Sequence, residues 1–143
     1  MTNNTNLQRA KQKKDDEFYT RLEDIEKELS HYVQYLVGKV IYCNADDEES
    51  NFWKYFTSNF QTLQIKKVIA TSYNSAGNGE MLEYDGKRVI KKSLVGNGSF
   101  DNQECKAILE QSDIIITNPP FSLFRCYIDT IKDKDFLVIG SIN

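Results

Sequence analysis

Four consecutive residues after an apolar run carry the clearest chemistry in the sequence. Asn118-Pro119-Pro120-Phe121 follow the run DIIIT at 113–117. Two prolines fix two φ angles, remove two amide donors and hold the residue before each in an extended conformation. The side-chain carbonyl of Asn118 and the main-chain carbonyl of Pro119 are thus expected to be rigid acceptors beside the Phe121 ring. Two acceptors and a ring suit a planar base with an exocyclic amine. The alternative is a stiff turn with a core phenylalanine, but the place after an apolar strand favours the binding site.

An acidic turn follows an earlier apolar run, KVIYCNA at 39–45. Asn44, Asp46 and Asp47 stand between this run and an expected helix. Carboxylates there can accept from ribose hydroxyls or pair with a ligand ammonium, and helix amides favour an anionic group. The alternative is a solvated turn that caps the helix. This stretch alone does not decide between the two.

Other chemical signals are weaker or missing. Phe18 and Tyr19 precede a helix that Thr20 is expected to cap, and they would either contact a ligand or, more simply, form a hydrophobic staple. The sequence has neither GxGxxG nor GxxxxGK[ST], which disfavours a dinucleotide site and a P-loop. His31 has no acid or thiol set at ligand spacing, and no CxxC pair occurs, so no metal site is predicted.

The elements that must position these residues alternate between strands and helices. The sequence predicts helices over 20–38, 51–63, 101–111 and 122–131, and strands over 39–45, 66–73, 113–117 and 135–140. A hairpin of 81–84 and 87–94 is expected around Asp85-Gly86. Short apolar strands separated by helices indicate a doubly wound α/β fold: a mainly parallel sheet with helices on both faces. Ligands of such sheets bind beyond the carboxyl ends of the strands.

Composition limits the class of protein. The 143 residues carry a net charge of −3, which argues against a surface built throughout to hold phosphates. No apolar run approaches the roughly 20 residues that span a bilayer, and the polar N-terminus is no secretory signal. Cys43, Cys105 and Cys126 are odd in number and read as free thiols, so a cytoplasmic protein is expected. Residues 1–14 are predicted to be a flexible polar arm.

Taken together, these motifs resemble the EcoRI-type family of adenine-specific DNA methylases. The resemblance rests on DDEFYT at 15–20, CNADD at 43–47, SNF at 50–52, GSF at 98–100, TNPPFSLFR at 117–125 and FLVIGSIN at 136–143. It implies a partial methyltransferase core at 15–143, with S-adenosylmethionine as cofactor and DNA as partner. The implied cofactor site comprises Phe18, Tyr19, Thr20, Asn44, Asp46, Asp47, Ser99 and Phe100. The implied catalytic residues, which would hold a flipped adenine, are Asn118, Pro119, Pro120 and Phe121.

The sequence departs from the family in three places. Ser99 and Asn97 stand where the family has acids, and ATSY at 70–73 offers no carboxylate for the ribose hydroxyls. The family also continues beyond a point equivalent to Asn143 into further strands and a target-recognition region. The expectation is therefore the catalytic half of a methylase, which would need that region to hold DNA.

Other functions stay open on the sequence alone. One is a non-catalytic remnant that binds the cofactor weakly at most. Another is methylation of RNA or of a protein glutamine, because NPP-type pockets also grip other amines and amides. A homodimer is a further option, since a truncated sheet would leave an edge and apolar surface uncovered.

Overall fold

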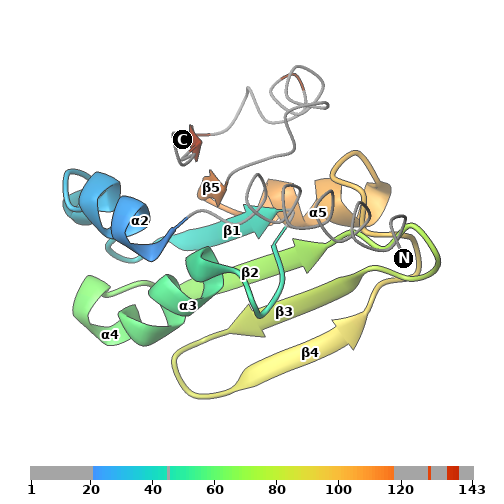
Figure 1. Cartoon of the computed structure of the whole chain (residues 1–143), viewed down its shortest axis with the longest axis horizontal. Helices are drawn as coiled ribbons and strands as arrows, with labels where there is room; N and C mark the ends of the chain where they lie inside the picture. The colour runs from blue at the N-terminus through green and yellow to red at the C-terminus, as the bar shows by residue number, and fades with distance from the viewer. Residues whose placement is uncertain (1–20, 45, 118–128, 130–134, 139–143) are drawn as a thin grey trace, which may run out of the picture.

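A mixed sheet stands at the centre of the structure, a computed structural model that describes residues 21–44, 46–117, 129 and 135–138 (Figure 1). Within these residues the strand order is β4-β3-β2-β1-β5-β6. The strands are β1 Val40–Asn44, β2 Lys67–Ser72, β3 Glu80–Tyr84, β4 Val89–Ser93, β5 Ile114–Thr117 and β6 Asp135–Val138. β1 pairs in parallel with β2 and β5, and β5 with β6, whereas β3 is antiparallel to both of its neighbours.

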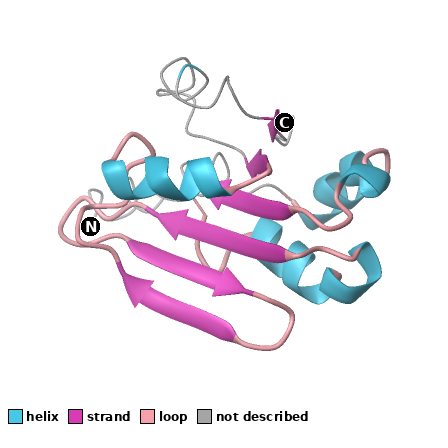
Figure 2. Cartoon of the chain, turned by 180° about the vertical axis from the view of Figure 1, so that it is seen from behind, coloured by secondary structure: helices cyan, strands magenta, loops and turns pink. Residues whose placement is uncertain are grey.

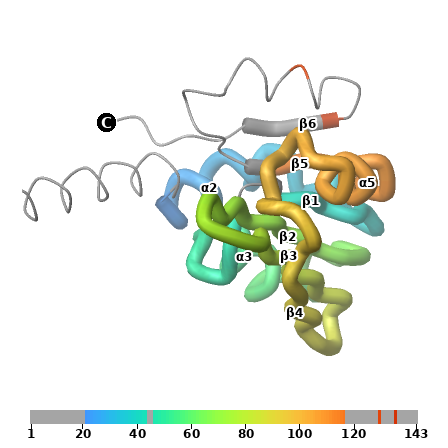
Figure 3. The backbone as a smooth tube through the Cα atoms, turned by 90° about the vertical axis from the view of Figure 1, so that its right-hand side faces the viewer, coloured from blue at the N-terminus to red at the C-terminus, as the bar shows by residue number. Residues whose placement is uncertain are grey.

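Helices cover both faces of this sheet. The sheet seen from its edge has α2 and α3 on one side and α5 on the other (Figure 3), and α5 lies in front of the strands when the molecule is viewed from behind (Figure 2). The helices are α2 Leu22–Leu29, α3 Asn51–Ser58, α4 Phe60–Leu63 and α5 Gln103–Gln111. The predicted doubly wound α/β fold is therefore confirmed, with the predicted hairpin as an antiparallel edge.

The side chains of successive residues in the central strands pack into two separate hydrophobic cores. In β1, Ile41 and Cys43 pack in the core under α2, α3 and α4, whereas Tyr42 packs in the core under α5. All three are fully buried. Alternate side chains of a strand point to opposite faces, so a strand covered on both faces must be apolar throughout. This requirement explains why the runs at 39–45 and 66–73 show no polar alternation.

The first helix is shorter than the predicted span of 20–38. It ends at Leu29, where the Ser30 hydroxyl donates to the Lys27 carbonyl at 2.6 Å. The Tyr32 amide donates to the Leu29 carbonyl at 2.9 Å. This bond spans three residues rather than four, so the chain tightens into a 3₁₀ turn at Val33–Tyr35. The apolar spacing continues through this turn because it is still packed on the same core.

The second predicted helix, 51–63, is divided at Asn59 into α3 and α4. The sequence predicts that Ser50-Asn51 caps this helix, and the cap is confirmed at Ser50, because its hydroxyl accepts from the Phe52 amide at 3.1 Å. The spacing of the apolar residues in this helix predicts one buried face, and this prediction is also confirmed. Its members are all buried: Phe52, Phe56, Phe60 and Leu63.

The sequence spacing predicts capping boxes of Thr20 with Glu23 and of Asp101 with Glu104, and both predictions are wrong. Arg21 is the N-cap of α2 in place of Thr20, and Asn102 is the N-cap of α5 in place of Asp101. Neither cap side chain bonds the helix amides. In α5 the acid of the predicted box, Glu104, binds the amides of a neighbouring loop instead, which a local sequence pattern cannot reveal.

The β3–β4 hairpin turns at Asp85-Gly86 as predicted. Gly86 has a φ of +92°, and the Asp85 carboxylate accepts from the amides of Lys87 at 2.9 Å and Arg88 at 3.1 Å. These two hydrogen bonds from backbone amides lower the pKa of Asp85. Because the chain reverses twice, the beginning of β3 and the end of β4 lie at the same edge as the carboxyl ends of β1 and β2.

Several predicted features lie outside the described residues. They are the polar arm at 1–14, the helix at 122–131 apart from Asp129, and the last two residues of the strand at 135–140. In the part of the chain that the structure describes, no helix has the length and apolar character needed to cross a membrane.

A close backbone crossing at Gly98 yields a stability prediction. Gly98 has a φ of +82°, and an added Cβ would lie 2.2 Å from the Ser72 carbonyl oxygen. We expect Gly98→Ala to lower the free energy of unfolding by about 2–4 kcal/mol, because strain and overlap add. Gly38→Ala is the control: its φ is +71° with nothing within 4 Å, and strain alone costs about 1 kcal/mol. Urea unfolding measures the free energy of unfolding of both variants. An equal loss of stability in the two would contradict a contribution from the close contact between Gly98 and Ser72.

Candidate functional site

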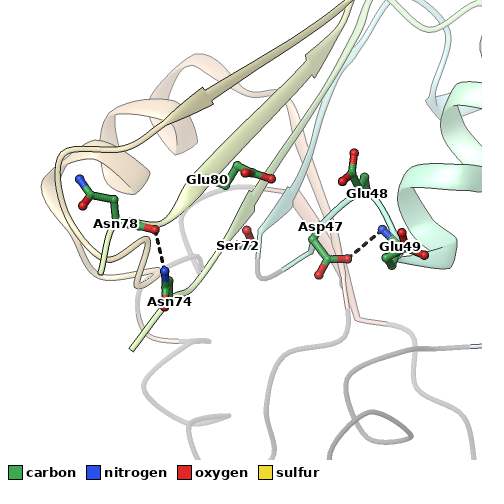
Figure 4. Close-up of a pocket in the computed structure, with 7 residues that line it drawn as sticks. All are labelled: Asp47, Glu48, Glu49, Ser72, Asn74, Asn78 and Glu80. Atoms are coloured by element: carbon green, nitrogen blue, oxygen red, sulfur yellow. Dashed lines mark hydrogen bonds between the residues drawn. The ribbon is translucent and has the colours of Figure 1, made fainter. Parts of the chain in front are cut away.

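A cleft of about 230 Å³ opens at the carboxyl edge of β1 and β2 (Figure 4). Three segments form its walls: the loop from β1 to α3, the exit of β2, and the entry to β3. The lining residues are Asp47, Glu48, Glu49, Ser72, Asn74, Asn78 and Glu80. This is the edge at which a doubly wound sheet binds its ligands.

The loop from β1 to α3 is fixed by a buried carboxylate. The Asp46 amide donates to the Thr71 carbonyl at 2.8 Å, and the Ser50 hydroxyl donates to Asp46 Oδ1 at 2.7 Å. Asp46 is only 3% exposed, and it is not among the lining residues. Burial first, and the nearby Asp46 charge second, raise the pKa of the Cys43 thiol, which stays neutral. Asp46 therefore holds the loop and is not part of the cleft lining, and its expected contact with the cofactor stays a prediction.

The next residue, Asp47, faces the cleft. Its Oδ1 accepts from the Glu49 amide at 2.9 Å, and its carbonyl accepts from the Ser50 amide at 3.0 Å (Figure 4). These bonds hold a half-buried carboxylate at the end of β1. Asp47 thus lines the cleft at the carboxyl edge of the sheet, and its role in binding a ligand stays a prediction.

The cleft is predominantly acidic. Four of its lining residues carry carboxylates, and two lysines neutralise part of that charge. Lys91 Nζ lies 3.1 Å from Glu48 Oε1 and 3.6 Å from Glu80 Oε1, and Lys54 Nζ lies 3.9 Å from Glu49 Oε2. In total, four negative charges face two positive ones. Such a site favours a ligand with a positive charge and hydroxyl donors.

Backbone hydrogen bonds hold the wall formed by the exit of β2 and the entry to β3 against the loop after β4. The Asn74 amide donates to the Asn97 carbonyl and the Gly79 amide to the Gly96 carbonyl, both at 2.8 Å. The Asn74 side chain donates to the Asn78 carbonyl at 3.1 Å (Figure 4). The loop after β4 is thereby packed against the exit of β2.

Comparison with known proteins places this chain in a family. The family described as adenine-specific methyltransferase EcoRI matches residues 6–92 and 79–143. The chain belongs to this family. It resembles the type II methyltransferase M.MpnI of Mycoplasma pneumoniae, with 47% identity over 135 residues, 92% of this chain and 42% of the relative. It also resembles M.EcoRI of Escherichia coli, with 44% identity over 158 residues, 96% of this chain and 48% of the relative.

A third relative is the type II methyltransferase M.MgeORF184P of Mycoplasma genitalium, 42% identical over 135 residues, which are 92% of this chain and 43% of the relative. The chain thus spans less than half the length of these relatives. No solved structure matches it significantly.

The EcoRI family motifs fall partly within the described residues. Asn44 ends β1, where it pairs with Thr71, and β5 ends at Thr117. Because β5 is parallel to β1, the chain leaves both strands at the same edge of the sheet. The motifs Phe18-Tyr19-Thr20 and Asn118-Pro119-Pro120-Phe121 lie outside the described residues. Their roles stay predictions.

Ser99 and Phe100, also expected at the cofactor site, do not line the cleft. The Ser99 hydroxyl donates to Asp101 Oδ1 at 2.5 Å, and its amide donates to Asn97 Oδ1 at 3.0 Å. Phe100 is half-buried and packs on the core under α5. Both belong to the loop after β4, which packs against the exit of β2, and a role in contacting the ligand remains a prediction.

Sequence reasoning missed an acid of the site, Glu80. ATSY itself has no carboxylate, but Ser72 of that stretch is paired with Glu80 across the β2–β3 ladder. An antiparallel strand enters at the edge where its partner leaves, so the first residue of β3 supplies an acid that the exit of β2 lacks. The predicted hairpin would have indicated this, had it been extended to the pairing with β2.

The bonds between Glu104 and the loop after β4 yield a prediction about the pH dependence of stability. Its carboxylate accepts from the amides of Gly96 at 2.7 Å and Val95 at 2.9 Å, and these bonds lower its pKa below the ordinary 4.5. A lowered pKa in the folded state gives stability that is full above pH 4.5 and is lost as the pH falls through the folded value. We therefore expect Glu104→Gln to be less stable at neutral pH and to lose less stability on acidification.

Thermal unfolding from neutral pH down to about pH 3 measures this difference. Glu28→Gln, which removes an exposed carboxylate of α2, is the control and should retain the acid sensitivity of the unaltered chain. If the stability of Glu104→Gln fell with pH as steeply as that of the unaltered chain, the two hydrogen bonds from Val95 and Gly96 would not be the cause of the acid sensitivity.

Proposed function

We propose that residues 15–143 are the catalytic half of a DNA methyltransferase that transfers a methyl group from S-adenosylmethionine to N6 of a flipped adenine. The observation that carries the proposal is the acidic cleft at the carboxyl ends of β1 and β2, in a chain that belongs to the EcoRI family. β5 ends at the same edge and is followed in sequence by Asn118-Pro119-Pro120-Phe121. Donor and acceptor sites would then lie side by side.

The donor set of the cleft fits this cofactor. S-adenosylmethionine carries a sulfonium, an ammonium, one carboxylate and a ribose diol, with a net charge of +1. Asp47 and Glu80 provide acceptors for the diol or the ammonium, and Ser72 provides a hydroxyl. The 230 Å³ of the cleft is below the roughly 300–1,000 Å³ of most ligand pockets. Phe18, Tyr19 and Thr20 are therefore proposed to complete the site around the methionine end.

Bound there, the cofactor supplies an electrophilic methyl group. The chain must make the adenine amine a better nucleophile, because its lone pair is delocalised into the ring. In the proposal the carbonyls of Asn118 and Pro119 accept hydrogen bonds from the two N6–H groups and stabilise the positive charge that grows on nitrogen. Transfer would form the methyl–N6 bond, break the methyl–sulfur bond to leave a neutral thioether, and release one N6 proton to solvent. Pro120 keeps the backbone rigid, and Phe121 stacks on the base. Extracting the adenine from the duplex costs a few kcal/mol.

We propose that DNA is bound jointly by this chain and by a region equivalent to the remaining part of the relatives. The net charge of −3 indicates that these 143 residues do not form a basic surface throughout. We place the activity in the cytoplasm, in line with the buried free thiols Cys43 and Cys105.

Calorimetric titration tests the cofactor site. We expect the chain to bind S-adenosylmethionine, and we expect Asp47→Asn to weaken binding about tenfold, since a hydrogen bond to a charged group contributes about 1.5–3 kcal/mol. Asparagine keeps the Oδ1 that accepts from the Glu49 amide, so the loop is retained. Glu28→Gln, which removes a charge on α2, should bind as the unaltered chain does. Equal affinities of all three proteins for S-adenosylmethionine would contradict the proposal that the cofactor binds at Asp47.

A methylation assay separates the catalytic half from a non-catalytic remnant. The chain is incubated with cofactor and DNA, alone and with a separately expressed C-terminal half of a relative, and N6-methyladenine is measured. We expect methylation in the mixture and its loss with Asn118→Ala, because one of the two acceptors is removed. Binding of cofactor without methylation in either case would identify a remnant, and methyl transfer to RNA or to protein would redirect the substrate assignment.

A further inference from the structure

Lys91 joins two walls of the cleft without lining it. It belongs to β4, the outermost strand beside β3, and its Nζ lies 3.1 Å from Glu48 Oε1 and 3.6 Å from Glu80 Oε1. Glu48 comes from the β1–α3 loop and Glu80 from the entry to β3, and both face the cleft (Figure 4). The loop crosses over β2 toward the hairpin to make this contact (Figure 1).

The sheet register explains why Lys91 reaches these acids and its neighbour does not. Lys91 is paired with Leu82, which packs in the core under α3, so Lys91 is on that face of the hairpin. Glu80, two residues before Leu82, is on the same face. Lys92 is paired with Met81 and lies on the opposite face, the face under α5. Two adjacent lysines thus place the same charge on the two faces of one strand.

We propose that Lys91 sets how strongly the cleft distinguishes S-adenosylmethionine from its demethylated product. The inference rests on the proposed function. Cofactor and product differ by one methyl group and by one positive charge on sulfur. Any charge near the cleft therefore acts on the difference between their affinities, whereas contacts to the shared ribose and adenine act on both alike. Lys91 counters two of the four carboxylates and so reduces the preference for the charged cofactor.

The lysine stays protonated throughout the range in which the site works. Its hydrogen bond to Glu48, followed by the charges of Glu48 and Glu80, raises the pKa of Lys91. At 49% exposure the side chain is partly screened by solvent, so its effect on the ligand is moderate. For charges roughly 10 Å apart in a partly solvated site, one unit of charge changes an affinity by about two- to fourfold.

The matched variants are Lys91→Met, Lys91→Arg and Lys92→Met, in the full 143-residue chain. Dissociation constants for S-adenosylmethionine and S-adenosylhomocysteine are measured by calorimetry, and thermal unfolding checks that each variant is folded. We expect Lys91→Met to raise the ratio of the product constant to the cofactor constant about threefold. Lys91→Arg and Lys92→Met should leave the ratio unchanged, and the threefold difference should shrink as salt rises from about 0.05 M to about 0.5 M.

The ratio separates electrostatic selection from a structural role. If Lys91 only ties the loop to the hairpin, Lys91→Met weakens both ligands by the same factor, and the proposal is overturned. The same ratio change in Lys92→Met would also overturn it, because the face of the strand would then be irrelevant. An unaltered chain that binds neither ligand refutes the proposed function itself, whereas binding of both with an invariant ratio refutes only the role of Lys91.

Discussion

The cleft depends on one buried arrangement at the exit of β1. The Asp46 amide binds the Thr71 carbonyl, and the Asp46 carboxylate accepts from Ser50, which in turn caps α3. A buried carboxylate is costly unless hydrogen bonds satisfy it, so this loop has few alternatives once the sheet and helix are in place. The helix cap and the half-buried acid that follows Asp46, Asp47, are thereby fixed relative to the carboxyl end of β2.

The antiparallel hairpin changes what a parallel edge can present. In a purely parallel sheet each strand contributes only the residues after its end, and the exit of β2 offers a serine and an asparagine at the cleft. β3 runs the other way and begins at this edge, which brings Glu80 opposite Ser72. The hairpin also brings Lys91 to the two acids. Edge strands are often protected by charged residues, and here such a charge also touches the candidate site.

The sequence predicted those parts of the fold that local chemistry determines. The apolar strands, the Asp85-Gly86 turn and the Ser50 cap each depend on a few neighbouring residues, and all are confirmed. What the sequence did not predict concerns residues whose placement depends on tertiary partners. Glu104 has the spacing of a capping acid, but it binds the amides of Val95 and Gly96. Glu80 has no motif around it, and only the register with β2 places it at the cleft. Asp46 and Asp47 look alike in sequence, yet burial gives them different roles.

The charge of this edge also limits how a nucleic acid can approach it. Phosphates are repelled by the carboxylates of Asp47, Glu48, Glu49 and Glu80, which Lys54 and Lys91 only half neutralise. A neutral base meets no such repulsion. If the proposed function holds, the acidic cleft therefore favours an extracted base over the duplex backbone, and the basic surface that holds the backbone must lie away from this edge. In the proposed function, the charge that would suit a cationic methyl donor would thus also separate the binding of the base from the binding of the DNA strand.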